Sequence, residues 1–104
     1  MIPEIDQNTF GDRLAQGDAL VVDVREAGEY RPGHVPGAQN VPLSALPDRL
    51  PELPKDQPVY VICQAGGRSA QATELMRAVG IDATSVTDGT GAWIEAGRPV
   101  ESAT

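Results

Sequence analysis

The chain has 104 residues, a formal net charge of −7 and a single cysteine, Cys63. A chain of this length forms one domain, residues 1–104, and buries enough surface to fold without a disulfide or a metal. One cysteine and one histidine, His34, exclude an internal disulfide and a Cys/His zinc cluster, and the negative charge argues against nucleic acid as a partner. The sequence has no apolar run of roughly 20 residues and no leader-like N-terminus, so we expect a cytoplasmic protein with no membrane partner.

The first part of the chain predicts two strands with a helix between them. Residues 2–5 suit a short strand, and either Asn8 or Thr9 has the side chain of a helix N-cap. The helix that follows is expected to end at Gly17, because glycine readily adopts the left-handed conformation that closes a helix. Residues 19–24 are nearly all apolar, which is typical of a strand that is covered on both faces in a parallel sheet.

The middle of the chain predicts short elements. Residues 26–30 suit one helical turn, which the Arg-Pro-Gly sequence at 31–33 ends, and residues 39–41 suit a short strand. Ser44 is expected to cap a short helix, in which Pro47 is tolerated because it lies in the first turn. The apolar side of that helix carries Leu46, Leu50 and Leu53.

The C-terminal part predicts two more strands and the two clearest helices. Residues 59–62 are all apolar and are the best candidate for the centre of the sheet, and residues 83–86 suit a final strand. Residues 69–79 show the helical periodicity of an apolar face, and residues 90–96 suit a last helix with Trp93 in the core. The apolar face of the 69–79 helix is expected to consist of Ala72, Leu75, Met76 and Val79.

This alternation of strands and helices predicts an α/β fold with a parallel sheet. In open parallel sheets the ligand site lies outside the carboxyl ends of the strands. Cys63 directly follows the strand expected at residues 59–62, so it is placed at such an end.

The segment from Cys63 to Ser69 has the features of a loop that stabilises a thiolate. It precedes a helix, whose dipole favours an anion, and Gly66 and Gly67 allow successive backbone N–H groups to turn toward one centre. Arg68 adds a positive charge within reach of the loop. We therefore expect a lowered pKa for Cys63, against the alternative that it is only a small apolar residue ending a buried strand.

The surroundings of Cys63 limit what a thiolate at this position can do. The loop contains no general base, and a pairing with His34 would require that segment to fold over it. Without a second cysteine, a dithiol cycle within the chain is excluded, which leaves attack on phosphorus, arsenic or sulfur. Cysteine-dependent phosphatases resemble this loop but place one more residue between cysteine and arginine. The tighter ring here suits a single sulfur atom better than a phosphoryl group.

Three segments of the sequence together resemble the single-domain rhodaneses, which are thiosulfate sulfurtransferases. The N-terminal segment includes the Asp-Val-Arg-Glu sequence at 23–26 and the Gly-His-Val-Pro-Gly-Ala sequence at 33–38. The second segment is the loop at 63–69, and the third contains Gly89, Ala92 and Trp93. The resemblance covers nearly the whole chain.

The resemblance implies a three-layer α/β/α fold with a five-stranded parallel sheet. It implies that the Cys63 thiolate takes a sulfur atom from a small anionic donor such as thiosulfate, becomes a persulfide and passes the sulfur to a nucleophile such as cyanide or a thiol. A sulfur-relay protein is a second candidate partner, and we expect no cofactor and no metal. The expected site consists of the catalytic Cys63 and the substrate-binding residues Gln64, Ala65, Gly66, Gly67, Arg68 and Ser69.

Two other functions stay open at this point: a cysteine phosphatase or arsenate reductase on the same scaffold, and a non-catalytic binding module. The chain also departs from the family pattern. Asp88 stands where a glycine is frequent, Gly91 stands where an apolar residue is common, and Gln64 replaces a frequent arginine. Asp23 and Arg25 are interpreted as an ion pair that anchors a strand end, and His34 as a turn residue bonded to the backbone.

Overall fold

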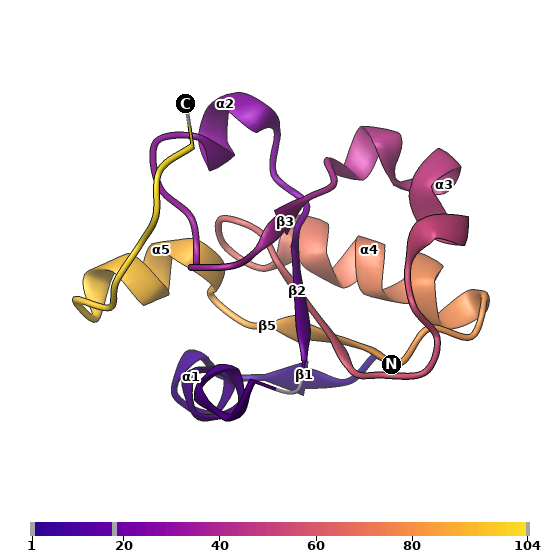
Figure 1. Cartoon of the computed structure of the whole chain (residues 1–104), viewed down its shortest axis with the longest axis horizontal. Coiled ribbons are helices and arrows are strands. Elements are labelled where there is room, and N and C mark those ends of the chain that lie inside the picture. The colour runs from indigo at the N-terminus through magenta and orange to yellow at the C-terminus, as the bar shows by residue number, and fades with distance from the viewer. Residues whose placement is uncertain (1, 18, 104) are drawn as a thin grey trace.

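The computed structural model describes residues 2–17 and 19–103, which form an α/β fold around a five-stranded sheet (Figure 1). All the strand pairings are parallel, and the strand order is β1-β5-β4-β2-β3. The strands are β1 (Glu4–Ile5), β2 (Leu20–Asp23), β3 (Gln39–Asn40), β4 (Val59–Ile62) and β5 (Ala83–Val86). The helices are α1 (Gln7–Gln16), α2 (Ala27–Tyr30), α3 (Leu46–Arg49), α4 (Gly67–Ala78) and α5 (Gly89–Glu95), with 3₁₀ turns η1 (Leu43–Ala45) and η2 (Leu50–Glu52) on either side of α3. The predicted fold class is confirmed.

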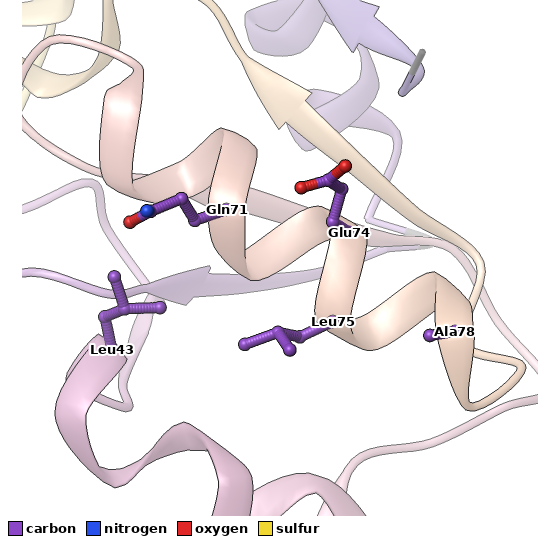
Figure 2. Close-up of a pocket in the computed structure, with 5 residues that line it drawn as sticks. All are labelled: Leu43, Gln71, Glu74, Leu75 and Ala78. Atoms are coloured by element: carbon purple, nitrogen blue, oxygen red, sulfur yellow. The ribbon is translucent and has the colours of Figure 1, made fainter.

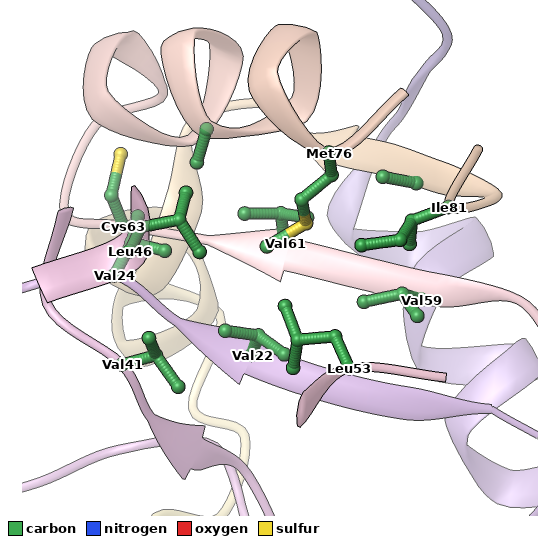
Figure 3. Close-up of a cluster of buried hydrophobic side chains, with 12 residues drawn as sticks. Val22, Val24, Val41, Leu46, Leu53, Val59, Val61, Cys63, Met76 and Ile81 are labelled. Carbon is green, nitrogen blue, oxygen red and sulfur yellow. The ribbon is translucent and has the colours of Figure 1, made fainter. Parts of the chain in front are cut away.

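Strand β4 is the middle of the sheet and is buried along its whole length, as its apolar sequence predicts. Its side chains alternate between the two faces. Val59 and Val61 pack, together with Cys63, in a cluster that includes residues of α3 and α4 (Figure 3). Tyr60 and Ile62 belong to a second cluster, with Phe10 of α1 and Trp93 of α5. The helices therefore form a layer on each face, as Figure 1 shows.

Helix α1 begins earlier than the sequence interpretation placed it. Its N-cap is Asp6, whose Oδ1 accepts a hydrogen bond from the Thr9 amide at 2.7 Å, so the expectation that Asn8 or Thr9 is the cap is wrong. A carboxylate at this position accepts a hydrogen bond from a first-turn amide that has no partner within the helix. The helix therefore begins directly after Asp6. The helix ends at Gly17, as expected, with φ +77°.

Ser44 does not cap a helix. It lies inside η1, its hydroxyl donates to Glu26 at 3.4 Å, and α3 begins at Leu46 after Ala45. Two prolines, Pro47 and Pro51, each lie in the first turn of a short element and divide the segment into successive turns instead of one helix.

Helix α4 buries a different face from the expected one. Leu75 and Val79 are 42% and 41% exposed, whereas Ala72 and Met76 are fully buried as expected. The buried stripe keeps the helical spacing but consists of Ser69, Ala72, Thr73 and Met76. Three of these four side chains, Ser69, Ala72 and Thr73, are small, which suits close packing of the helix on the sheet, and Leu75 and Val79 lie on the more exposed side.

Candidate active site

Cys63 lies between the carboxyl end of β4 and the beginning of α4, where the sequence placed it. The parallel register sets Asp23, the last residue of β2, beside Ile62, so the segments that follow β2 and β4 leave the sheet together. Strand β5 pairs with β4 on its other side, and the turn after it leads into α5. The segments that follow β2, β4 and β5 thus leave the sheet side by side, and the Cys63 loop is the middle one.

A backbone amide of the loop donates to the sulfur. The Gly66 N–H donates to Sγ at 3.1 Å. Gly66 has φ +115°, a conformation that glycine adopts without strain, and it is this conformation that turns the loop into the helix. The glycine-rich sequence thus turns the Gly66 N–H toward the sulfur, which is one contact of the predicted nest.

The Cys63 side chain is only 1% exposed and packs in the apolar cluster of α3, α4 and the sheet. Figure 3 shows its sulfur beside the first turn of α4. The alternative of a small side chain ending a buried strand therefore describes its burial correctly, but not its polar contacts. The sulfur lies at a boundary, with apolar side chains on one side and amide donors on the other.

Burial has the largest single effect on the thiol and raises the pKa of Cys63. Hydrogen bonds from the Ser69 hydroxyl and from the amides of Ser69, Gly66 and Ala65 act in the opposite direction, and together they bring the pKa below its ordinary value. The Ser69 hydroxyl lies 3.5 Å from Sγ. The direction of the pKa shift agrees with the expectation from the loop, although the main contributors are hydrogen bonds and not Arg68.

The charge of Arg68 is shared with a neighbouring acid. Its guanidinium nitrogens donate to both carboxylate oxygens of Glu29 in α2, at 2.6 and 2.8 Å. This hydrogen bonding lowers the pKa of Glu29 to about 2. Arg68 therefore offers the loop a smaller positive potential than its sequence position suggests.

Arg25 and Asp23 form a buried ion pair, as the sequence interpretation proposed. The closest contact is 2.9 Å, and the side chains are 4% and 0% exposed. Arg25 also donates to the Gln64 side-chain oxygen at 3.2 Å and to the Gly33 carbonyl at 2.9 Å. The pair therefore anchors the end of β2 and also fixes Gln64, a contact that sequence reasoning missed.

The first turn of α5 supports the loop from the other side. The amide of Thr90 donates to the Cys63 carbonyl at 2.8 Å, and that of Gly91 donates to the Gln64 carbonyl at 3.0 Å. A β-carbon on Gly89 would collide with the Cys63 carbonyl oxygen, and one on Gly91 would lie 3.2 Å from atoms of Gln64. A side chain at position 91 would therefore press on Gln64.

Asp88 has a left-handed backbone, with φ +60°. Glycine adopts this conformation most easily, and aspartate is one of the few other residues that tolerate it. Asp88 also borders a hollow of about 410 Å³ beside the loop, together with Gln64, Ala65, Gly91, Ala92 and Glu95.

The structure has a second hollow, of about 450 Å³, between η1 and the outer face of α4 (Figure 2). Figure 2 shows Leu43 and Leu75 on its two sides, and none of the residues 63–69 lines it.

Within residues 2–17 and 19–103, no three His, Cys, Asp or Glu side chains gather in a group that could hold a metal ion. No helix in the described part of the chain is both long and apolar enough to span a bilayer.

His34 and Trp93 lie outside the loop and have the structural roles expected of them. His34 Nδ1 is 2.9 Å from the Tyr30 carbonyl oxygen, a backbone contact within the turn. Trp93 is 3% exposed, and its indole N–H donates to the Pro99 carbonyl.

Comparison with known proteins identifies the family. The model of the rhodanese-like domain matches residues 6–96. The chain belongs to the rhodanese-like family. It is 35% identical over 102 residues to a sulfurtransferase of Allochromatium vinosum, and the match covers 96% of this chain and 95% of the relative.

Solved rhodanese-like structures have the same fold. A rhodanese-related protein of Thermoplasma volcanium aligns with a TM-score of 0.90 at 32% identity and covers 95% of this chain and 97% of its own. The human single-domain sulfurtransferase TSTD1 aligns with a TM-score of 0.85 at 28% identity, over 91% of this chain and 97% of its own. The resemblance to the rhodaneses is confirmed, and sulfurtransferase activity is supported at the level of the family. The chain spans 40% to 52% of the length of three other curated relatives.

Proposed function

We propose that this rhodanese-like protein is a sulfurtransferase that carries a sulfane sulfur as a persulfide on Cys63. The observation that carries the proposal is the polar contact of the Cys63 sulfur inside the glycine-rich loop: the Gly66 amide donates to Sγ at 3.1 Å, and the Ser69 hydroxyl oxygen lies 3.5 Å from it. The donor is thiosulfate or a persulfide, and the acceptor is a thiophilic nucleophile such as cyanide or a thiol.

The proposed reaction has two displacements. The Cys63 thiolate attacks the outer sulfur of thiosulfate, an S–S bond forms, and the bond to the sulfonate sulfur breaks with its electron pair leaving on sulfite. The acceptor then attacks the outer sulfur of the Cys63 persulfide, and the electron pair of the broken S–S bond returns to Cys63 as a thiolate. Each step transfers a neutral sulfur atom, so the charge on the protein stays the same and no outside oxidant or reductant is needed.

The loop amides supply the electrostatic stabilisation that both displacements need. Negative charge lies on Cys63 before attack and on the outer sulfur of the persulfide afterwards, and fixed N–H dipoles stabilise such charge without reorganising. Because Cys63 is nearly buried, its thiolate has few contacts with water, and the amides replace that solvation.

The donor has to approach through charges that are already paired. Arg68 is bound to Glu29, and Arg25 is bound to Asp23. In this proposal Arg68 attracts the anionic donor. Because Glu29 neutralises part of the positive charge, the attraction is weaker than that of a free arginine. A donor with less negative charge than thiosulfate, such as the persulfide of a thiol or of a sulfur-relay protein, depends less on this field.

The mass of the intact protein after incubation with thiosulfate tests the proposal. We expect a gain of one sulfur atom that cyanide removes, and no gain in Cys63→Ser. Release of phosphate from an aryl phosphate without this gain would identify a phosphatase instead. A protein inert to both reagents would be a binding module. We also propose a cytoplasmic location, where reducing conditions keep a free thiol available.

A further inference from the structure

We propose that Ser85 in strand β5 is a positioning residue for Cys63 that acts through Ser69. The two hydroxyl groups form a hydrogen-bond relay: when the thiol ionises, Ser85 donates to Ser69, and the Ser69 hydroxyl donates its hydrogen bond to the sulfur. The inference rests on the proposed use of Cys63 as a thiolate. It assigns a role to a residue that lies outside the loop at 63–69.

The sheet register places Ser85 behind the loop. Ser85 pairs with Val61 of β4, and parallel neighbours in register point to the same face of a sheet. Val61, Ala83 and Cys63 all lie in the apolar cluster on this face, where Ser85 is 1% exposed. A hydroxyl in such a position is costly to bury unless it has a partner, and its partner is the Ser69 hydroxyl at 2.8 Å.

Ser69 has one hydroxyl proton and three neighbouring acceptors. Its oxygen lies 3.5 Å from Cys63 Sγ, 3.1 Å from the Gly66 carbonyl oxygen and 2.8 Å from Ser85 Oγ. A serine hydroxyl donates one hydrogen bond and accepts two. Which neighbour receives the proton therefore depends on what the other two groups donate.

The protonation state of Cys63 determines the direction of the relay. As a thiol, Cys63 donates to Ser69, and the Ser69 proton goes to Ser85 or to the Gly66 carbonyl. As a thiolate, Cys63 only accepts, so the Ser69 proton turns to the sulfur, and the lone pairs of Ser69 are free to accept from Ser85. The donation from Ser85 polarises the Ser69 hydroxyl and strengthens its bond to the anion.

The two arginines near Cys63 are each paired with an acid, so their charges stabilise the thiolate only in part. Arg68 of α4 is paired with Glu29 of α2, and Arg25 is paired with Asp23 at the end of β2. Asp88 contributes a negative charge from the turn before α5. Because both cations are paired, the hydrogen bonds to the sulfur have a decisive share in stabilising the thiolate.

The rate of alkylation of Cys63 by iodoacetamide, measured against pH, tests the relay. We expect Ser85→Ala to move the midpoint of the profile upward and to lower the rate at pH 7 by roughly threefold to tenfold, with the plateau at high pH unchanged. The matched control is Thr73→Val, which removes a buried hydroxyl that donates to the Ser69 carbonyl and not to the sulfur. The control is expected to keep the wild-type midpoint.

A double-mutant cycle separates a relay from a general disturbance of the core. Because Ser85 acts through Ser69, adding Ser85→Ala to Ser69→Ala should not move the midpoint further. Additive shifts, or a Ser85→Ala profile with the wild-type midpoint, would overturn the proposal. If Ser85→Ala does not fold, Ser85→Thr keeps the hydroxyl and has to retain the wild-type midpoint. Alkylation does not require sulfur transfer, so the relay and the proposed function can fail separately.

Discussion

Both carboxylate oxygens of Glu29 bind the guanidinium of Arg68, at 2.6 and 2.8 Å, and so pair the positive charge that the Cys63 loop itself carries. The pair joins α2 to the first turn of α4. Its consequence for catalysis is testable, because removing the charge of Glu29 and removing the charge of Arg68 are expected to change the binding of thiosulfate in opposite directions.

Glu29→Gln is expected to lower the KM for thiosulfate by roughly twofold to fivefold, since the released Arg68 charge attracts a dianion more strongly. Glutamine keeps a side-chain oxygen that can accept the hydrogen bond from the Glu26 amide, which is 3.1 Å long in the wild type. The start of α2 is therefore preserved. Arg68→Ala is expected to raise the KM. Initial rates at several salt concentrations check both, and an unchanged or higher KM in Glu29→Gln would contradict the role given to Arg68.

The same ion pair predicts a change of stability in acid. The hydrogen bond from Arg68 lowers the pKa of Glu29 from 4.5 to about 2, so the folded protein binds this proton less readily than the unfolded chain. The pair therefore stabilises the fold fully above about pH 4.5 and progressively less as the pH falls toward 2. Urea unfolding of wild type and Glu29→Gln should show a difference at pH 6 that shrinks between pH 4.5 and 2. A difference that stays constant over this range would exclude the linkage.

The strands and the loop could be predicted from the sequence because their signals are local. The apolar run at Val59–Ile62 needs cover on both faces wherever it lies, and the glycine at 66 lets the backbone turn its N–H toward Cys63 Sγ. The site contacts between distant segments could not be predicted. Glu29 and Arg68 are 39 residues apart, and their contact depends on how α2 and α4 pack.

The buried face of α4 shows a different reason for failure. Helical periodicity gives the spacing of a buried stripe, but two neighbouring stripes of α4 satisfy it. The apolar residues Leu75 and Val79 favour one stripe, whereas close packing on the sheet favours the other, with Ser69 and Thr73. Hydroxyl groups are acceptable there only because each finds a partner, which the sequence does not reveal.

The contact between Gly89 and the loop predicts that Gly89→Ala is strongly destabilising. The new β-carbon would collide with the Cys63 carbonyl, and Gly89 has φ +54°, so both sterics and backbone strain oppose alanine. We expect a loss of more than about 2 kcal/mol in the free energy of unfolding. Gly28→Ala is the control, because Gly28 lies in α2 with nothing within 4 Å of its β-carbon position. The control should be neutral or stabilising by up to about 1 kcal/mol.

The buried pair of Asp23 and Arg25 predicts a large asymmetry between ion pairs of similar length. Asp23→Asn leaves the guanidinium of Arg25, whose side chain is 4% exposed, without its counter-charge, and we expect a loss of about 3 kcal/mol or more. The surface pair of Arg49 and Glu52 is also short, 2.8 Å, but its side chains are 42% and 58% exposed, so Arg49→Gln should change stability by less than about 1 kcal/mol. Chemical denaturation of both variants provides the measurement. A mild effect of Asp23→Asn on stability combined with loss of sulfur transfer would show instead that the pair takes part in the chemistry.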